Sequence, residues 1–162
     1  MDRFQIKKVL ADLKKKMVIL SGPRQVGKTW LSHEVMTYYN KSIYLNYDDF
    51  KHQKIIKEKT WLNENDLIVF DELHKMKNWK TFLKGVYDTK KPHQHILVTG
   101  SARLNAYNEL GESLAGRFFR HRLFPYTLIE LNEIKSEVSL DNLFERGGFP
   151  EALLSENIID VD

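Results

Sequence analysis

One stretch near the start of the chain constrains the fold more than any other: an apolar run, then a loop framed by two glycines, then a helical pattern. Residues 17–20 read Met-Val-Ile-Leu, which is typical of a short buried strand. Gly22, Gly27, Lys28 and Thr29 then fill the pattern G-x-x-x-x-G-K-[ST] of a phosphate-binding P-loop. Apolar residues recur at helical spacing beyond this motif. The stretch therefore predicts a strand, a phosphate loop and a helix in succession, although a glycine turn that only caps a helix shares part of the pattern.

The chemistry of this loop follows from its residue types. Gly22 and Gly27 permit positive φ and a close approach of the backbone, so that successive N–H groups converge on an anion. The start of the helix adds its free N–H groups and the positive end of its dipole. Lys28 can reach the β- and γ-phosphates, and the Thr29 hydroxyl can ligate Mg²⁺, so we predict a nucleoside triphosphate with Mg²⁺ as the ligand. The predicted nucleotide-binding residues are Gly22, Pro23, Arg24, Gln25, Val26, Gly27, Lys28, Thr29 and Trp30.

Composition indicates one globular domain, or one domain with a short appendage. Of the 162 residues, 42% are hydrophobic and 12% aromatic, which is enough for a sound core. There is no cysteine, which excludes disulfides and thiolate metal sites. No apolar run approaches the roughly 20 residues of a membrane helix, and the first residues lack the apolar core of a signal peptide. We therefore expect a soluble cytoplasmic protein that does not engage a membrane.

Charge divides the chain into two parts. Residues 128–162 hold nine acids and two bases, whereas the other 127 residues hold 23 bases and 13 acids, a net charge of +10. We therefore expect a basic core over residues 1–127 and an acidic helical extension over residues 128–162. The basic core could attract nucleic acid. A lysine-rich solvated surface explains the same composition, since the lysines are scattered.

Apolar and polar segments alternate along the chain in the manner of an α/β fold. Predicted strands cover residues 17–21, 42–47, 67–70, 95–99 and 118–124. Predicted helices cover residues 4–13, 27–39, 50–61, 77–87, 104–114, 126–134 and 140–145, and another begins at 151. Strands that alternate with helices indicate a parallel sheet with helices on both faces.

The apolar strand at residues 67–70 ends in two acids, Asp71 and Glu72. Ligands of α/β sheets bind beyond the carboxyl ends of the strands. Asp71 is then placed to hold Mg²⁺ opposite Thr29, usually through water. Glu72, one residue further, can polarise a water for in-line attack on the γ-phosphorus. Two solvated acids that cap the next helix are the alternative.

Three further side chains are candidates for catalysis, each with a structural alternative. Thr99 or Ser101 can contact the γ-phosphate or orient the attacking water if their strand lies between the other two, and Ser101 is equally suited to cap a helix. Arg117 can enter a neighbouring subunit's site as an arginine finger, or it is a surface cation at a helix C-terminus. Arg24, inside the loop, fits a contact to phosphate, a contact to the next subunit or a solvated position.

With these motifs assembled, the chain resembles the AAA+ family of P-loop ATPases, and within it a bacterial and archaeal branch. The resemblance rests on five segments: Gly-Pro-Arg-Gln-Val-Gly-Lys-Thr at Gly22–Thr29, Asp71-Glu72, Thr99–Ser101, Leu114–Arg117 and Gly147–Glu151. It implies a three-layer sandwich whose five-stranded parallel sheet has the order 5-1-4-3-2.

The resemblance also implies roles for individual residues. It places Lys28 and Thr29 on ATP and Mg²⁺, makes Asp71 the Walker B metal residue and makes Glu72 the catalytic base. It gives Thr99 or Ser101 a sensor role, and it makes Arg117 a finger that would join copies into a homo-oligomer. Chains of this branch are usually much longer, so residues 128–162 correspond to the beginning of a lid or linker.

Three functions remain open from these residues. The first is Mg²⁺-dependent ATP hydrolysis, with activity weakened where a lid is missing. The second is a switch or interaction module that binds ATP without turning it over. The third is a small P-loop kinase, against which Glu72 beside Asp71 argues because a kinase needs an acceptor pocket and a closing lid rather than a water-activating acid. ATP is the expected nucleotide because no Asn-Lys-x-Asp guanine signature is present.

Overall fold

Five parallel strands form one sheet in the computed structural model of the chain, which describes residues 3–61, 64–101, 114–133 and 139–154. The strand order is β2-β3-β4-β1-β5. The strands are β1 (Met17–Ser21), β2 (Ser42–Asn46), β3 (Leu67–Asp71), β4 (His95–Gly100) and β5 (Phe118–Arg122). Counted from the other edge this is 5-1-4-3-2, so the predicted α/β class and sheet order are confirmed.

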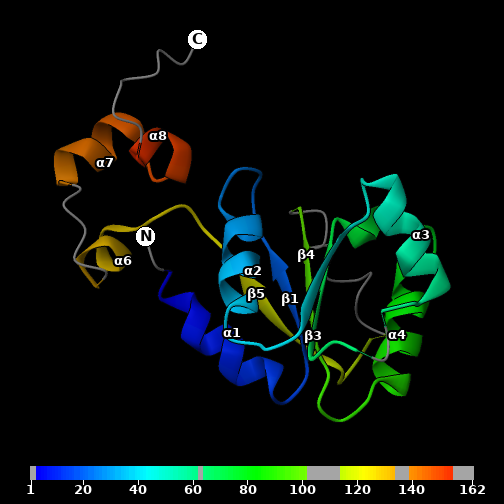
Figure 1. Cartoon of the computed structure of the whole chain (residues 1–162). Helices are drawn as coiled ribbons and strands as arrows, with labels where there is room; N and C mark the ends of the chain where they lie inside the picture. The colour runs from blue at the N-terminus through cyan, green and yellow to red at the C-terminus, as the bar shows by residue number, and fades with distance from the viewer. Residues whose placement is uncertain (1–2, 62–63, 102–113, 134–138, 155–162) are drawn as a thin grey trace.

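Helices cover both faces of the sheet (Figure 1). On one face α1 (Gln5–Leu13) and α2 (Lys28–Met36) pack against alternate residues of the central strands. On the other face α3 (Phe50–Glu58) and α4 (Trp79–Thr89) do the same. All five residues of β1 and of β3 are buried. The apolar runs of the sequence are continuous because these strands are covered on both sides.

Several boundaries differ from the sequence prediction: α2 ends at Met36 and not at residue 39, and β5 ends at Arg122 and not at residue 124. The helix α4 begins at Trp79 and not at residue 77, because the short 3-10 turn η1 (Leu73–Lys75) and a left-handed Asn78 with φ 62° come before it. The helix α3 ends at Glu58, since Lys59 is left-handed with φ 55°. The helix predicted over residues 104–114 lies outside the described residues, apart from its last residue.

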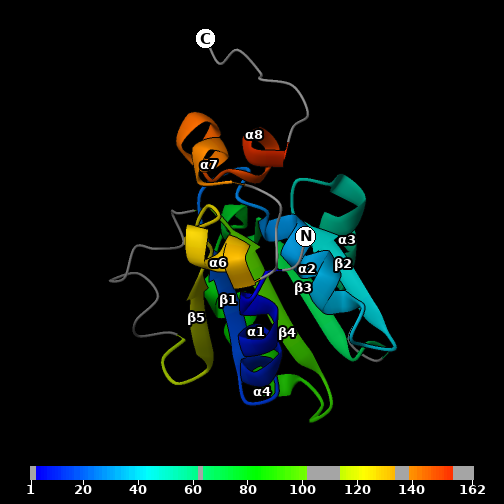
Figure 2. The ribbon, with the colours of Figure 1, turned by 90° about the vertical axis from the view of Figure 1, so that its left-hand side faces the viewer.

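The C-terminal part forms three short helices, α6 (Leu128–Glu133), α7 (Leu140–Arg146) and α8 (Pro150–Leu154). Figures 1 and 2 show α7 and α8 at the end of the molecule where the loop between β1 and α2 lies. Their shared core is small: its buried members are Tyr126, Leu131 and Leu153. Apolar side chains remain at the surface there, including Ile129 at 73% and Phe144 at 80% exposure.

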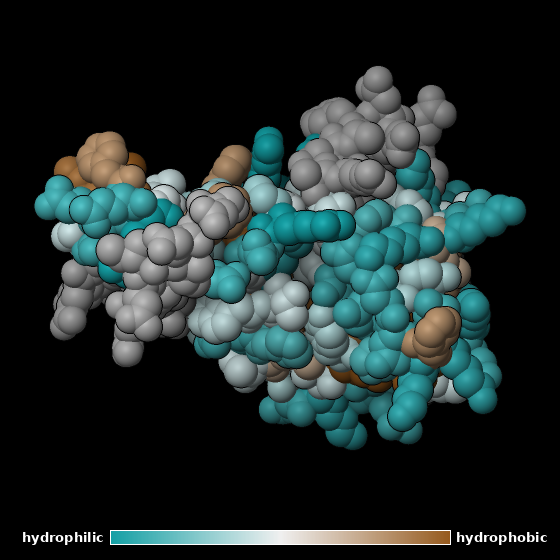
Figure 3. Space-filling model, turned by 90° about the horizontal axis from the view of Figure 1, so that it is seen from above, coloured by the Kyte–Doolittle hydropathy of each residue, from teal (hydrophilic) through white to brown (hydrophobic). Residues whose placement is uncertain are grey.

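The carboxyl ends of the strands form the face that carries the candidate site. The register aligns Ser21 of β1 with Gly100 of β4, and Thr99 of β4 with Asp71 of β3. The last residues of three neighbouring strands therefore lie at one edge. Figure 3 looks onto this side of the molecule, where hydrophilic side chains dominate the described surface. No helix in the described residues is long and apolar enough to cross a bilayer.

Candidate functional site

The loop between β1 and α2 has the backbone form of a phosphate cradle. Gly27 is the N-cap of α2 with φ 93° and ψ 22°, a left-handed conformation that favours glycine. Gln25 also has a positive φ, 59°. Left-handed residues within a short loop turn neighbouring N–H groups to one side, the nest arrangement that binds anions. The N–H groups in the first turn of α2 extend this donor set.

Position 22 requires glycine because the backbone after β5 lies too close to leave room for a side chain. A Cβ at Gly22 would lie 2.5 Å from the carbonyl oxygen of Leu123 and 3.2 Å from Cγ1 of Val26. The N–H of Leu123 donates to the carbonyl oxygen of Ser21 at 2.7 Å, which holds the two backbones together. The first glycine of the motif therefore lets the chain after β5 pack directly on the loop.

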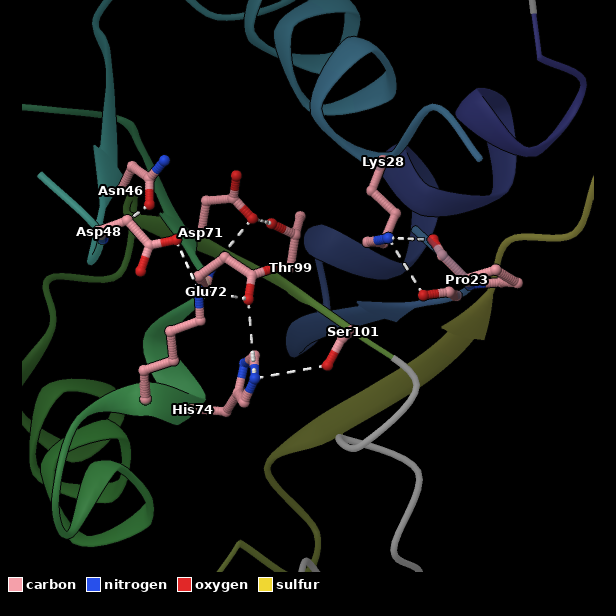
Figure 4. Close-up of polar contacts among 11 residues, drawn as sticks. Pro23, Lys28, Asn46, Asp48, Asp71, Glu72, His74, Thr99 and Ser101 are labelled. Carbon is pink, nitrogen blue, oxygen red and sulfur yellow. Dashed lines mark hydrogen bonds and ion pairs between the residues drawn. The ribbon is translucent and has the colours of Figure 1, made fainter. Parts of the chain in front are cut away.

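Lys28 folds back over the loop. Its Nζ donates to the carbonyl oxygens of Gly22, at 3.1 Å, and of Pro23 (Figure 4). The residue is only 8% exposed. Burial lowers the pKa of Lys28, while the negative charges of Glu72 and Asp71 oppose that shift. The ammonium therefore lies within electrostatic range of both acids, and its two carbonyl partners are groups that phosphate oxygens can replace.

The other predicted loop residues differ in exposure. Val26 is fully buried, and Pro23 is half-buried. The solvent-facing ones are Arg24, Gln25, Thr29 and Trp30. Their side chains are thus open to a ligand, and Trp30 keeps 40% of its surface exposed immediately beyond the phosphate loop.

Asp71 ends β3 at the centre of a hydrogen-bond cluster. Its Oδ1 accepts from the hydroxyl of Thr99 and, at 3.0 Å, from the N–H of Glu72. The carboxylate is 5% exposed, so these donors replace the water it loses. The structure therefore brings Asp71, Glu72 and Thr99 together on adjacent strands.

Tyr44 of β2 belongs to this cluster and was not predicted. Its hydroxyl donates to Oδ2 of Asp71. Burial, together with the Asp71 carboxylate, raises the pKa of Tyr44 well above its usual value, so the phenol stays protonated. The phenol thus lies against Asp71 and close to Thr29, the two residues predicted to hold Mg²⁺. Side-chain alternation places Tyr44 on the same face as Asn46, the register partner of Asp71, and that signal could have identified it.

Glu72 enters a second polar cluster at the mouth of the site. It adopts the left-handed region with φ 53°, uncommon for a residue with a side chain. Its carboxylate lies 3.7 Å from Nε2 of His74 and 3.5 Å from Nζ of Lys75. Ser101 joins through a contact of 3.4 Å between its Oγ and Nε2 of His74 (Figure 4). Neither His74 nor Lys75 was predicted as a site residue, although both follow Glu72 within three positions.

Arg117 lies at the other end of the sheet. It directly precedes β5, whose first residue Phe118 pairs with Met17, the first residue of β1, whereas the phosphate loop follows the last residue of β1. Its Nε contacts Oδ1 of Asp88 at 2.8 Å. Hydrogen bonds from the Arg117 guanidinium lower the pKa of Asp88. Within one chain, Arg117 is therefore not brought to the other candidate residues.

The oxygen donors around Asp71 suit a magnesium ion that arrives with phosphate. In the part of the chain that the structure describes, no three histidine, aspartate or glutamate side chains gather as a metal site. Mg²⁺ commonly takes one or two protein oxygens and completes its shell with water and substrate phosphates. Asp71 and the Thr29 hydroxyl, with the phenol of Tyr44 close to both, fit that pattern.

A family model described as an AAA domain matches residues 14–132. An uncharacterized protein of Methanocaldococcus jannaschii is 27% identical over 173 residues, covering 95% of this chain and 34% of that protein. An uncharacterized protein of Haemophilus influenzae is 22% identical over 163 residues, covering 85% of this chain and 40% of that protein. The chain therefore spans little more than a third of the length of these relatives.

Solved structures share the fold. A Walker-type ATPase of Pyrococcus abyssi has a TM-score of 0.61 and 16% identity, covering 92% of this chain and 64% of that chain. A RuvB variant of Thermotoga maritima has a TM-score of 0.54 and 22% identity, covering 80% and 46%. The Orc1 protein of Aeropyrum pernix, solved in complex with DNA, has a TM-score of 0.51 and 15% identity, covering 83% and 48%.

Proposed function

The chain belongs to the AAA family of P-loop ATPases, and we propose that it binds ATP with Mg²⁺ and hydrolyses it to ADP and phosphate. The observation that carries the proposal is the meeting of three features at one edge of the sheet. These are a left-handed Gly27 that opens α2, a buried Lys28 and the acids Asp71 and Glu72.

Binding begins with the exchange of partners at Lys28. Its Nζ leaves the carbonyl oxygens of Gly22 and Pro23 for phosphate oxygens, a change that keeps the buried ammonium hydrogen-bonded. The N–H groups of the loop and of the first turn of α2 hold the remaining phosphate oxygens. The exposed Trp30 and Arg24 border the same loop and are available to the rest of the nucleotide.

Hydrolysis assigns one role to each acid. Asp71 and Thr29 would hold Mg²⁺, which supplies neutralisation of the charge on the phosphates when bound. Glu72 accepts a proton from a water whose oxygen attacks the γ-phosphorus, and the bond from γ-phosphorus to the bridging oxygen breaks to leave ADP and phosphate. Lys28 stabilises the negative charge that develops during this transfer. The Thr99 hydroxyl keeps Asp71 oriented, and Ser101 is placed beside the water-activating cluster.

A second candidate is an ATP-binding switch without turnover, because the Glu72 carboxylate lies within ion-pair distance of both His74 and Lys75. If these contacts persist with ATP bound, Glu72 is kept from the attacking water. The same chain would then bind ATP tightly and release phosphate only at the uncatalysed rate.

Phosphate release measured over a series of protein concentrations tests the proposal. We expect Mg²⁺-dependent release by the wild type and at least a hundredfold lower rate in Glu72→Gln, as for the loss of a general base. Glu58→Gln is the matched control, since Glu58 is an exposed α3 residue away from the site. Release without Mg²⁺, or an unchanged rate in Glu72→Gln, would refute hydrolysis at this site.

Assembly and further partners belong to the same proposal. Since Arg117 lies at the far end of the sheet, it can serve catalysis only in the site of another copy, which makes the rate per subunit rise with concentration. An Arg117→Ala variant would lose that rise. Nucleic-acid binding, suggested by the basic core, would appear as retarded migration of DNA that high salt abolishes.

A further inference from the structure

The N-terminal Arg3 is buried although it carries a full charge. It is 2% exposed and precedes α1, the first helix of the chain. Its guanidinium contacts three segments that are far apart in the sequence: the phosphate loop, the end of β5 and the helix α6. Burying a guanidinium is costly unless its donors are paired, so each contact is a strong constraint on its partner.

The first contact orients the phosphate loop itself. One NH2 group of Arg3 donates to the carbonyl oxygen of Val26 at 2.7 Å. The carbonyl of Val26 and the N–H of Gly27 belong to one planar trans peptide, so they point in opposite directions. Holding the carbonyl toward Arg3 therefore fixes the N–H of Gly27 on the side of the peptide that faces away from Arg3. Arg3 thus sets the direction of a donor that the cradle requires.

The second set of contacts ties Arg3 to the C-terminal part of the chain. Its NH1 lies 2.9 Å from Oε2 of Glu130 in α6, with both side chains at most 5% exposed. The guanidinium also stacks on the ring of Tyr126 at 3.5 Å. Removal of one partner of such a pair leaves an uncompensated charge in the interior. Residues 126–154 and the phosphate loop therefore share one buried cation.

The turn after α7 packs against Tyr126 and brings α8 close to the phosphate loop. The carbonyl oxygen of Gly148 accepts the N–H of Tyr126 at 2.6 Å, and a Cβ at Gly148 would lie 2.3 Å from the carbonyl oxygen of Tyr126. Pro150, the first residue of α8, lies 3.8 Å from the position of a Cβ on Gly27. The C-terminal helices thus come close to the loop at Gly27 and are linked to the loop backbone through Arg3.

We propose that Arg3 is a positioning residue that couples docking of the C-terminal helices α6, α7 and α8 to the geometry of the phosphate loop. Docking favours the loop form that binds ATP, and bound ATP favours docking by the same factor, since linkage is reciprocal. The hydrophobic core of these helices has only three buried members among the described residues, so loss of the ion pair should change their docking by a measurable amount. The inference rests on the proposed function in one respect, that the ligand of the loop is ATP.

Two variants separate positioning from simple structure. Glu130→Gln removes the charge of the partner with almost no change in shape, and Arg3→Lys keeps the cation but loses the fork that reaches both Val26 and Glu130. Lys7→Ala is the matched control, an exposed cation on α1. ATP affinity is measured with a fluorescent analogue, and circular dichroism confirms that each variant is folded. We expect both variants to bind about tenfold more weakly and the control to bind as the wild type, within the 5- to 150-fold range of such couplings.

Docking is measured in the other direction with a thiol reporter. Because the chain contains no cysteine, Leu153→Cys introduces a single thiol at a position that is 3% exposed in the core of the extension. ATP should slow its modification by the factor found for affinity, and Glu130→Gln should remove that slowing.

Two results would overturn the coupling: unchanged ATP affinity in Glu130→Gln, or ATP binding that leaves the modification rate unchanged. Failure of the wild type to bind ATP would instead refute the proposed function. The modification rate of Glu130→Gln without nucleotide would still report whether the ion pair holds the extension in place.

Discussion

Gly22→Ala tests whether the phosphate loop depends on the contact between its first glycine and the chain after β5. A new Cβ would lie 2.5 Å from the carbonyl oxygen of Leu123, whereas Cβ atoms essentially never come within 3.0 Å of a heavy atom outside their own residue and its chain neighbours. The two backbones must then separate by at least about 0.5 Å. The hydrogen bond of 2.7 Å from Leu123 to Ser21 resists that movement.

The expected magnitude follows from this overlap. Overpacking of this kind costs about 1–3 kcal/mol, and each kcal/mol shifts the midpoint of thermal unfolding by about 2–4 °C at this chain length. We therefore expect the midpoint of Gly22→Ala to fall by roughly 2–12 °C. Its affinity for ATP should fall as well, because the displaced segment begins the cradle.

The matched control is Gly85→Ala in α4. A Cβ there meets no heavy atom within 4 Å, and alanine favours a helix over glycine by about 0.5–1 kcal/mol. Thermal unfolding of both variants by circular dichroism, followed by ATP titration, gives the comparison. A Gly22→Ala variant that unfolds and binds ATP like Gly85→Ala would refute the argument that the close contact at Leu123 shapes the loop.

Further predictions concern side chains around and away from the site. Tyr44→Phe removes a hydrogen bond to the charged Asp71, worth about 1.5–3 kcal/mol, which Mg²⁺ would otherwise have to displace. The Mg²⁺ concentration that half-saturates ATP binding should therefore fall about tenfold or more in a Mg²⁺ titration, and a higher Mg²⁺ requirement would mean that the phenol supports the ion. Arg117→Ala should leave ATP affinity at low protein concentration unchanged in the same titration, and a large loss would contradict its place at the far end of the sheet. Arg117 lowers the pKa of Asp88, so the stability that this pair adds is present above pH 3.8 and disappears as the pH falls through the lowered pKa. Urea unfolding at several pH values should show the free energies of unfolding of the wild type and Arg117→Ala converging in acid, and a difference that persists would contradict the pairing.

The fold was largely predictable because its signals are local. The apolar runs at β1 and β3 are buried on both faces, and such runs distinguish a parallel sheet from a half-exposed one. Strand order came from the resemblance and not from the residues, since alternating strands and helices are compatible with several orders. The boundaries of α3 and α4 were missed because left-handed Lys59 and Asn78 end or delay a helix without glycine or proline.

The candidate site was predictable where a motif or the end of a strand marks its members. Lys28 belongs to the P-loop pattern, and Asp71 and Thr99 come together because the carboxyl ends of parallel strands meet at one edge. Tyr44 was missed because its role depends on the side-chain direction in a neighbouring strand. Arg3 was missed because its partners, Val26 and Glu130, are distant in the sequence and no motif marks them.

In the proposed function, Gly22–Thr29 and the acids Asp71 and Glu72 form one site for ATP with Mg²⁺. Calorimetric titration of ATP with and without Mg²⁺ into the wild type, Lys28→Ala and the exposed control Lys54→Ala tests whether they do. We predict one site per chain, binding strengthened by Mg²⁺, and no detectable binding to Lys28→Ala while Lys54→Ala is unaffected. Equal ATP affinity in the wild type and Lys28→Ala would show that Gly22–Thr29 is not the ATP site.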